Sequence, residues 1–227
     1  MENKKAKGKG NAPGEKTKKV SKYLFLIDPG HGGLINGKYT TPGKRSPVFP
    51  DGFVLYEGVN NRDNAKRLVQ KLKFMGLDAV DIVDSEQDIS LGERVRRANN
   101  LNKKKKTIYI SLHSDGAGNG REFHPGKGSS VFTSVGQTKS DVFAEIAFNK
   151  LKTNFGDSIL YRRDLLDGDS DKEAHFYVLK NTAMPAVLFE LGFHTHEIEA
   201  KRILTEGFKN KALDAIAYTC LEWELNH

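Results

Sequence analysis

The chain has 227 residues, which is enough for one domain of ordinary size with a sizeable core. A hydrophobic content of 37% favours a globular protein, and no apolar run approaches the roughly 20 residues that a membrane-spanning helix needs. The single cysteine, Cys220, excludes an internal disulfide, and its place in an apolar helical pattern predicts a buried thiol.

The net charge of +7 is concentrated at the N-terminus. Residues 1–22 contain eight lysines and two glutamates, whereas the remainder contains 28 basic and 27 acidic residues. This segment has no aromatic residue and almost nothing to bury, so we expect a basic disordered tail. It lacks the apolar stretch of a secretory signal, which predicts synthesis in the cytoplasm without a signal peptide. Two interpretations stay open: a solvated leader, or an electrostatic tether to an anionic polymer such as cell wall or nucleic acid.

The body, residues 23–227, alternates strand and helix patterns. Strands are predicted at 23–27, 77–83, 107–112, 129–133, 176–179 and 186–191, and helices at 59–75, 90–101, 142–151, 197–204 and 208–222. Ser90 and Glu93 form a capping-box pattern at the start of one helix. The segments 32–52 and 155–172 are expected to be long loops, which are often functional. This alternation predicts an α/β fold: a mainly parallel twisted sheet with helices on both faces, in a single domain.

The lysine run Lys103–Lys106 lies between the second predicted helix and the next strand. It has no interleaved aromatic side chains on which bases could stack, so we interpret it as a solvated charge run. Nucleic acid is therefore not expected as a partner of the body.

Four polar residues follow strands or precede a helix at positions that can meet. His31 stands in the Gly/Pro turn of LFLIDPGHGG, Glu57 precedes the first helix, His113 follows strand 107–112, and Glu190 ends the apolar run AVLFE. In open α/β sheets, ligands bind outside the carboxyl ends of the strands. We therefore expect these four side chains to converge at one edge of the sheet.

Two histidines and one glutamate are the donor set of a catalytic zinc site whose fourth position is open to water. A second carboxylate beside the metal can take the proton of that water and pass it to a leaving nitrogen. Glu190 ends a buried strand, so it needs a partner or a proton, and a structural salt bridge is the alternative interpretation. The pattern is compatible with a metal hydrolase, and a purely structural role of these residues stays open.

Five segments in order resemble the type-3 family of zinc-dependent N-acetylmuramoyl-L-alanine amidases: LIDPGHGG, YEGVNN, ISLGERVRRAN, YISLHSD and YVLKNTAMPAVLFELGF. The resemblance covers residues 23–220 and makes residues 23–227 the catalytic domain. It implies that His31, Glu57 and His113 bind one zinc ion and that Glu190 is the general base. The implied substrate is peptidoglycan, cleaved at the amide between the lactyl group of N-acetylmuramic acid and L-alanine of the stem peptide.

Three segments depart from that resemblance. The loops 32–52 and 116–128 are idiosyncratic and could reshape the substrate cleft. His194-Thr195-His196 follows the last motif, and we interpret it as a polar helix start rather than as metal ligands.

The absence of a leader favours a phage endolysin released at lysis over an exported wall enzyme. Two rival functions stay open. One is another zinc hydrolase such as a peptidase, and the other is a non-catalytic module that binds cell wall or nucleic acid. Glu190 argues against the second, because binding alone needs no base.

Overall fold

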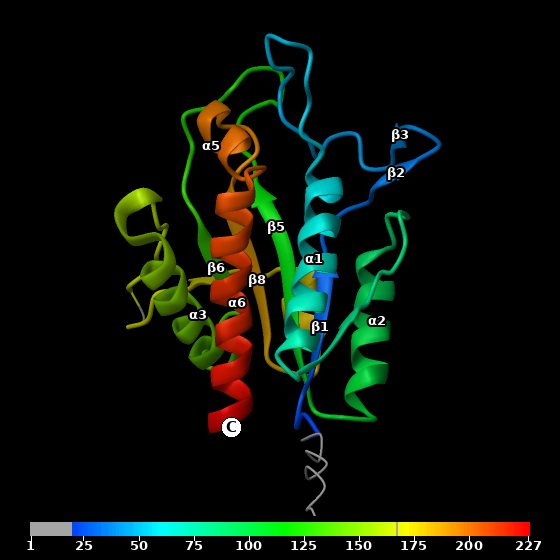
Figure 1. Cartoon of the computed structure of the whole chain (residues 1–227), viewed down its shortest axis with the longest axis vertical. Coiled ribbons are helices and arrows are strands. Elements are labelled where there is room, and N and C mark those ends of the chain that lie inside the picture. The colour runs from blue at the N-terminus through cyan, green and yellow to red at the C-terminus, as the bar shows by residue number, and fades with distance from the viewer. Residues whose placement is uncertain (1–19, 167) are drawn as a thin grey trace, which may run out of the picture.

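A six-stranded sheet forms the middle layer of the protein, in the strand order β4-β1-β5-β8-β6-β7 (Figure 1). The computed structural model describes residues 20–166 and 168–227. The strands are β1 (Leu24–Pro29), β4 (Asp78–Asp81), β5 (Thr107–Asp115), β6 (Ser130–Thr133), β7 (Lys172–Glu173) and β8 (Ala186–Phe193). β4, β1, β5 and β8 are parallel, and β6 joins β8 in the antiparallel direction with β7 parallel to β6. The predicted mainly parallel sheet is confirmed.

Helices cover both faces of this sheet, as the sequence predicts. They are α1 (Glu57–Phe74), α2 (Leu91–Asn102), α3 (Lys139–Phe155), α4 (Tyr177–Asn181), α5 (Glu197–Arg202) and α6 (Glu206–Asn226). α1, α3 and α6 lie side by side over one face, and α2 and α4 pack on the other. α5 lies beyond the end of β8 (Figure 1).

Side chains of each strand alternate between two buried clusters, because successive residues of a strand point to opposite faces. In β5, Ile108 and Ile110 belong to the cluster under α1, α3 and α6, whereas Tyr109 belongs to the cluster under α2 and α4. Burial of one such side chain contributes about 1.5–3 kcal/mol to the free energy of folding. Cys220 lies in the first cluster and is fully buried, as predicted.

Two local predictions are wrong. The apolar run 176–179 is not a strand but the start of α4, a one-turn helix whose Val178 and Leu179 are both buried. Four apolar residues are too few for periodicity to separate a strand from a helix. The predicted loop 32–52 contains a hairpin of β2 (Leu34–Ile35) and β3 (Lys38–Tyr39). Its turn residues, Asn36 and Gly37, both have positive φ, which is the Asn-Gly signal of a tight hairpin.

The predicted disordered tail lies outside the described residues, except for residues 20–22. Those residues contact the C-terminal helix through one carboxylate. Glu224 accepts hydrogen bonds from the Ser21 hydroxyl at 3.1 Å and from the backbone N–H groups of Lys22 and Tyr23 at 2.6 and 3.1 Å. The chain therefore enters the fold beside the end of α6.

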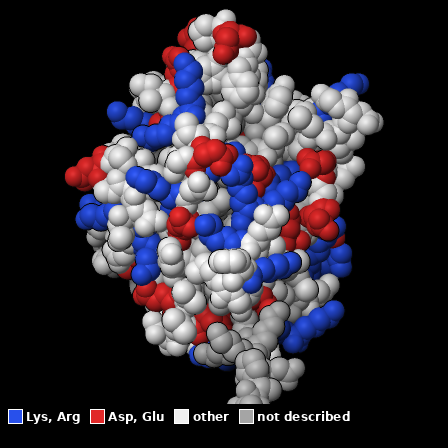
Figure 2. All heavy atoms as spheres, viewed as in Figure 1, with Lys and Arg blue, Asp and Glu red and all other residues white. Residues whose placement is uncertain are grey.

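The surface of the body carries both signs of charge. On the face shown in Figure 2, Lys and Arg side chains are interspersed with Asp and Glu side chains. This mixture agrees with the nearly balanced charge that the sequence gives to the body outside the basic segment.

Candidate metal centre

The structure brings the four predicted site residues together at the carboxyl ends of the parallel strands. His31 follows β1, Glu57 is the first residue of α1, His113 lies in β5 and Glu190 lies in β8. The β5–β8 register pairs His113 directly with Glu190, so these two side chains share one face of the sheet. All four line a cavity of about 300 Å³.

The turn that carries His31 is shaped by its neighbouring glycine. His31 has φ 65°, in the left-handed region that few non-glycine residues adopt. At Gly30, a Cβ atom would lie 2.1 Å from Cε1 of His113, so only glycine allows the turn to pass over that ring. The two imidazole rings then meet edge to face, with centroids 4.9 Å apart.

Two buried arginines hydrogen-bond to the backbone of this turn. The His31 carbonyl accepts hydrogen bonds from Arg62 at 2.8 Å and from Arg94 at 2.9 Å. Arg94 also pairs with the buried carboxylate of Asp28 and donates to the Pro29 carbonyl at 2.8 Å. Sequence reasoning placed Arg94 in a helix motif without giving it a role. The sequence did contain a sign of this role, because Arg94 lies on the apolar side of a predicted helix, where a charged side chain needs a buried partner.

Glu57 is the centre of the cluster. Its Oε1 lies 3.0 Å from Nδ1 of His113 and accepts a hydrogen bond from the Ser114 N–H at 3.2 Å. Its Oε2 lies 3.2 Å from Nε2 of His31 and has no hydrogen-bond partner among the described residues. Burial alone would raise the pKa of Glu57, but the nearby imidazoles of His113 and His31 outweigh it and hold the pKa well below its usual range. The carboxylate is therefore ionised and one oxygen is free for another ligand.

The donor atoms of His31, Glu57 and His113 all lie within 4.8 Å of one another. Two imidazole nitrogens and one carboxylate oxygen suit zinc, and the unpartnered Oε2 of Glu57 marks a polar atom that a cation would satisfy. The residues present thus fit a metal ion.

Glu190 differs from Glu57 although both are buried. No imidazole hydrogen-bonds to Glu190 among the described residues, and its Oε2 has no partner there. Burial, followed by repulsion from the Glu57 carboxylate, raises the pKa of Glu190 well above its usual range. A carboxyl group with a raised pKa beside a donor set is typical of a group that exchanges protons.

The expected polar helix start at residues 194–196 is only partly what the structure shows. His196 is the N-cap of α5 and its Nδ1 accepts a hydrogen bond from the Glu199 N–H at 3.3 Å. His194 instead is 4% exposed and lines the site cavity, with Nδ1 3.8 Å from Oε2 of Glu57. Burial lowers the pKa of His194. The sequence analysis assigned both histidines to a polar helix start, because nothing in the spacing separates His194 from His196.

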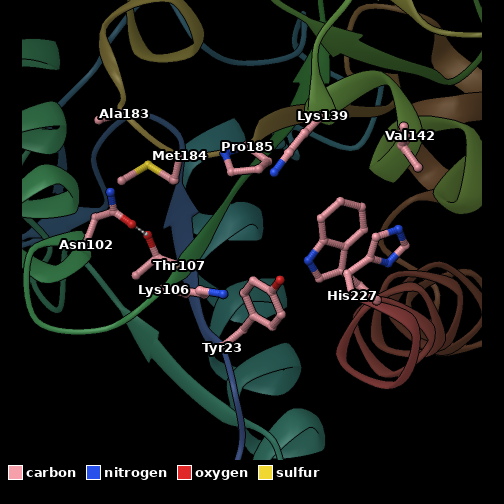
Figure 3. Close-up of a pocket in the computed structure, with 11 residues that line it drawn as sticks. Tyr23, Asn102, Lys106, Thr107, Lys139, Val142, Ala183, Met184, Pro185 and His227 are labelled. Atoms are coloured by element: carbon pink, nitrogen blue, oxygen red, sulfur yellow. Dashed lines mark hydrogen bonds between the residues drawn. The ribbon is translucent and has the colours of Figure 1, made fainter.

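A second cavity, of about 520 Å³, is lined by residues at the amino ends of β1, β5 and β8, the opposite ends of these strands from the site residues. Figure 3 shows its lining. Tyr23, Met184 and Pro185 are among its lining residues, and Thr107 donates a hydrogen bond to Asn102 across one wall at 2.9 Å. None of the four predicted site residues lines it. The smaller, polar cavity is therefore the candidate site.

Comparison with known proteins agrees with this geometry. The family model described as N-acetylmuramoyl-L-alanine amidase matches residues 25–220. The amidase LytC of Bacillus subtilis is 30% identical over 216 residues, which cover 91% of this chain and 38% of LytC. The endolysin of Bacillus phage SPP1 is 25% identical over 205 residues, covering 87% of this chain and 64% of the endolysin.

Among solved structures, the crystal structure of an N-acetylmuramoyl-L-alanine amidase from Clostridium difficile 630 superposes with a TM-score of 0.71 and 25% identity. It covers 91% of this chain and 99% of that one. The chain spans less than two fifths of the first curated relatives that it matches. In the described part of the chain, no helix has both the length and the apolar character of a membrane span. Because the family model matches most of its length, the chain belongs to the N-acetylmuramoyl-L-alanine amidase family, as its motifs predict.

Proposed function

We propose that the protein is a zinc-dependent N-acetylmuramoyl-L-alanine amidase whose catalytic domain comprises residues 23–227. It hydrolyses the amide between the lactyl group of N-acetylmuramic acid and L-alanine of the peptidoglycan stem peptide. The observation that carries this proposal is the His31–Glu57–His113 donor set beside a buried carboxylate, Glu190, that no described residue pairs with.

His31, Glu57 and His113 would hold the zinc ion. When bound, zinc polarises a carbonyl and lowers the pKa of water from about 15.7 toward roughly 7. The chain contributes the position of its donors. Arg62 and Arg94 fix the His31 carbonyl, and the backbone N–H of Ser114 fixes Oε1 of Glu57. Outer contacts of this kind typically change metal affinity or activity by about 10–100-fold.

Glu190 would move the proton. Its carboxylate takes a proton from the attacking water while the water oxygen bonds to the lactyl carbonyl carbon. It then gives that proton to the L-alanine nitrogen as the C–N bond breaks, so a free amine leaves and a lactyl carboxyl group remains. A raised pKa suits both halves of this exchange, because a stronger base accepts the proton more readily near neutral pH.

The route to the substrate stays a prediction. Family relatives include a bacterial amidase and a phage endolysin, so release at lysis and export both agree with membership. The lysine-rich segment 1–22 would attract anionic wall polymers, and this effect would be strongest at low salt. A zinc peptidase on the same scaffold is the rival function.

Mass spectrometry of digested peptidoglycan tests the proposal. We expect free stem peptides that begin at L-alanine together with glycan strands that keep the lactyl group. Fragments cut between two amino acids would identify a peptidase instead. Glu190→Gln, digested in parallel, controls for contaminating hydrolases because it keeps the three donors and removes the proton acceptor.

A further inference from the structure

His194 is a buried imidazole in the site cavity that neither the donor set nor the proton transfer uses. It follows β8 directly, and its backbone N–H donates to the Asp115 carbonyl at 2.9 Å, which ties it to the end of β5. Its ring is 4% exposed and lies on the cavity wall. The position is therefore built by the sheet rather than by a mobile loop.

The ring is held in one orientation through Nδ1. This nitrogen lies 2.9 Å from the Ser114 carbonyl and 3.1 Å from the Ser114 hydroxyl. A carbonyl oxygen only accepts, so Nδ1 carries the hydrogen. Nε2 of the neutral ring is then a lone-pair acceptor, and it has no hydrogen-bond partner among the described residues.

A glycine keeps the space beside Nε2 clear. A Cβ atom on Gly116 would lie 2.8 Å from Nε2 of His194, closer than real Cβ contacts allow. Gly43 lines the same cavity, yet a Cβ atom there would meet nothing within 4 Å. Both glycines line the cavity, but only at Gly116 would an added methyl group contact Nε2 of His194, so Gly43 serves as the comparison position.

We propose that His194 is a substrate-binding residue whose Nε2 accepts a hydrogen bond from an amide N–H of the muramoyl peptide. This inference rests on the proposed amidase function and deepens it by naming a residue that selects the substrate. The ligand chemistry follows from the site. Nε2 is an oriented hydrogen-bond acceptor, so its ligand must supply a hydrogen-bond donor. The muramoyl peptide has such donors in the amide N–H groups of its stem peptide and of its acetamido group. Nδ1 lies 3.8 Å from Oε2 of Glu57, so His194 lies beside the proposed metal donors.

The variant His194→Asn separates this role from a structural one. Asparagine places an amide N–H near the position of Nδ1, which keeps the bond to Ser114, but has no atom at the position of Nε2. With a soluble muropeptide, we expect kcat/KM to fall about 3- to 10-fold, the usual range for one neutral hydrogen bond. Zinc content and Tm should stay at wild-type values. Unchanged kcat/KM would overturn the proposal, and loss of zinc would make His194 a metal ligand instead.

The glycine pair gives a second, independent test. Gly116→Ala should lower kcat/KM by a similar factor, and this loss should exceed that of Gly43→Ala, whose added Cβ meets nothing within 4 Å. In a His194→Asn background, Gly116→Ala should add no further loss, because neighbours that act through one contact are not additive. Full additivity of the two losses would overturn the proposal.

The same assays on a lactoyl peptide, which lacks the sugar, identify the donor. If kcat/KM of His194→Asn is still below that of the wild type on this substrate, the N–H that binds Nε2 belongs to the stem peptide. If the two values become equal, the N–H belongs to the acetamido group. Two failures can be told apart. If the wild type releases no peptide that begins at L-alanine, the proposed amidase function is wrong. If the wild type is active and His194→Asn is equally active, only the role of His194 is wrong.

Discussion

Two groups of carboxylates, all buried except the half-buried Asp169, lie at different edges of the same sheet. One is the site pair, Glu57 and Glu190, at the carboxyl ends of β5 and β8. The other, which we call the edge cluster, comprises Asp141, Asp169 and Asp171 near β6 and β7. In the edge cluster, Asp171 accepts a hydrogen bond from the Thr133 hydroxyl at 2.6 Å. Each of the three carboxylates of the edge cluster has one buried oxygen without a hydrogen-bond partner among the described residues.

The two groups differ in the residues that surround their carboxylates, and the pKa values differ as a result. Two imidazoles hold the pKa of Glu57 well below its usual range against the effect of burial. At the edge cluster, burial and the neighbouring Asp169 raise the pKa of Asp171 to about 7. Burial of acids therefore does not identify a catalytic site by itself. The two imidazole nitrogens beside Glu57, which form with it a donor set drawn from three separate segments, distinguish the metal centre.

The largest effect that this comparison predicts concerns the metal. His31→Ala removes one of three donors, and we expect zinc content to fall from one ion per chain to near zero in elemental analysis. Asp171→Asn is the matched control, since it changes a buried acid that has no imidazole partner and should keep the metal. Full zinc retention in alanine variants of all three donors would contradict the assignment.

The second effect separates the two acids of the site. Glu190→Gln keeps the side-chain volume but cannot accept a proton, so turnover should fall about 10²–10⁴-fold. Zinc content should remain that of the wild type, and Tm should stay the same or rise because a buried carboxyl becomes a neutral amide. Zinc and turnover are measured on the same purified sample. Metal loss in this variant would make Glu190 a ligand, contrary to its proposed role.

The third effect concerns the support of the His31 turn. Arg94→Met leaves the buried carboxylate of Asp28 without its charge partner, which typically costs about 3–5 kcal/mol of unfolding free energy. Arg96→Met, on the same helix, removes a solvent-exposed pair with Glu93, which contributes little to stability, so its loss should be much smaller. Urea titrations of both variants measure the difference. Equal losses would show that the buried Arg94–Asp28 pair contributes no more to stability than the exposed pair.

The fourth effect is a pH dependence at the edge cluster. The folded pKa of Asp171, about 7, lies above its ordinary value of 3.8, so the folded state binds more protons than the unfolded state between them. The stabilising contribution of this group is complete below pH 4 and is lost as the pH rises through 7. We expect Asp171→Asn to remove a decline of about 1–3 kcal/mol between pH 4 and pH 8. A wild-type stability curve that the substitution leaves unchanged would contradict this expectation.

The smallest effect is expected from the basic tail. Deletion of residues 1–19 should leave turnover of a soluble muropeptide unchanged, because every motif of the site lies in the body. Binding to whole sacculi should weaken, more at 20 mM than at roughly 200 mM salt because screening grows with ionic strength. The deletion stops before Ser21, whose hydroxyl contacts Glu224. Lower turnover on the soluble substrate would mean that the tail contributes to the fold or the site.

Much of this molecule could be predicted from its sequence. Strand–helix alternation is periodic over long segments, so the parallel sheet and its two helix layers followed directly. The convergence of His31, Glu57, His113 and Glu190 followed from the rule that strands of a parallel sheet end at one edge. His194 and the two arginines behind His31 could not be found this way. Their roles depend on the direction of a side chain after a strand end and on a carbonyl 63 residues away in the sequence from Arg94.

The contact of Ser21, Lys22 and Tyr23 with Glu224 has a consequence for protein engineering. It places the point of chain entry beside the end of α6, while the carboxyl ends of β1 and β5, next to the site residues, lie at the opposite end of the sheet (Figure 1). A domain fused at either position would project away from the mouth of the cavity. Immobilised on a bead through either position, the protein would present its cleft outward, toward an insoluble polymer.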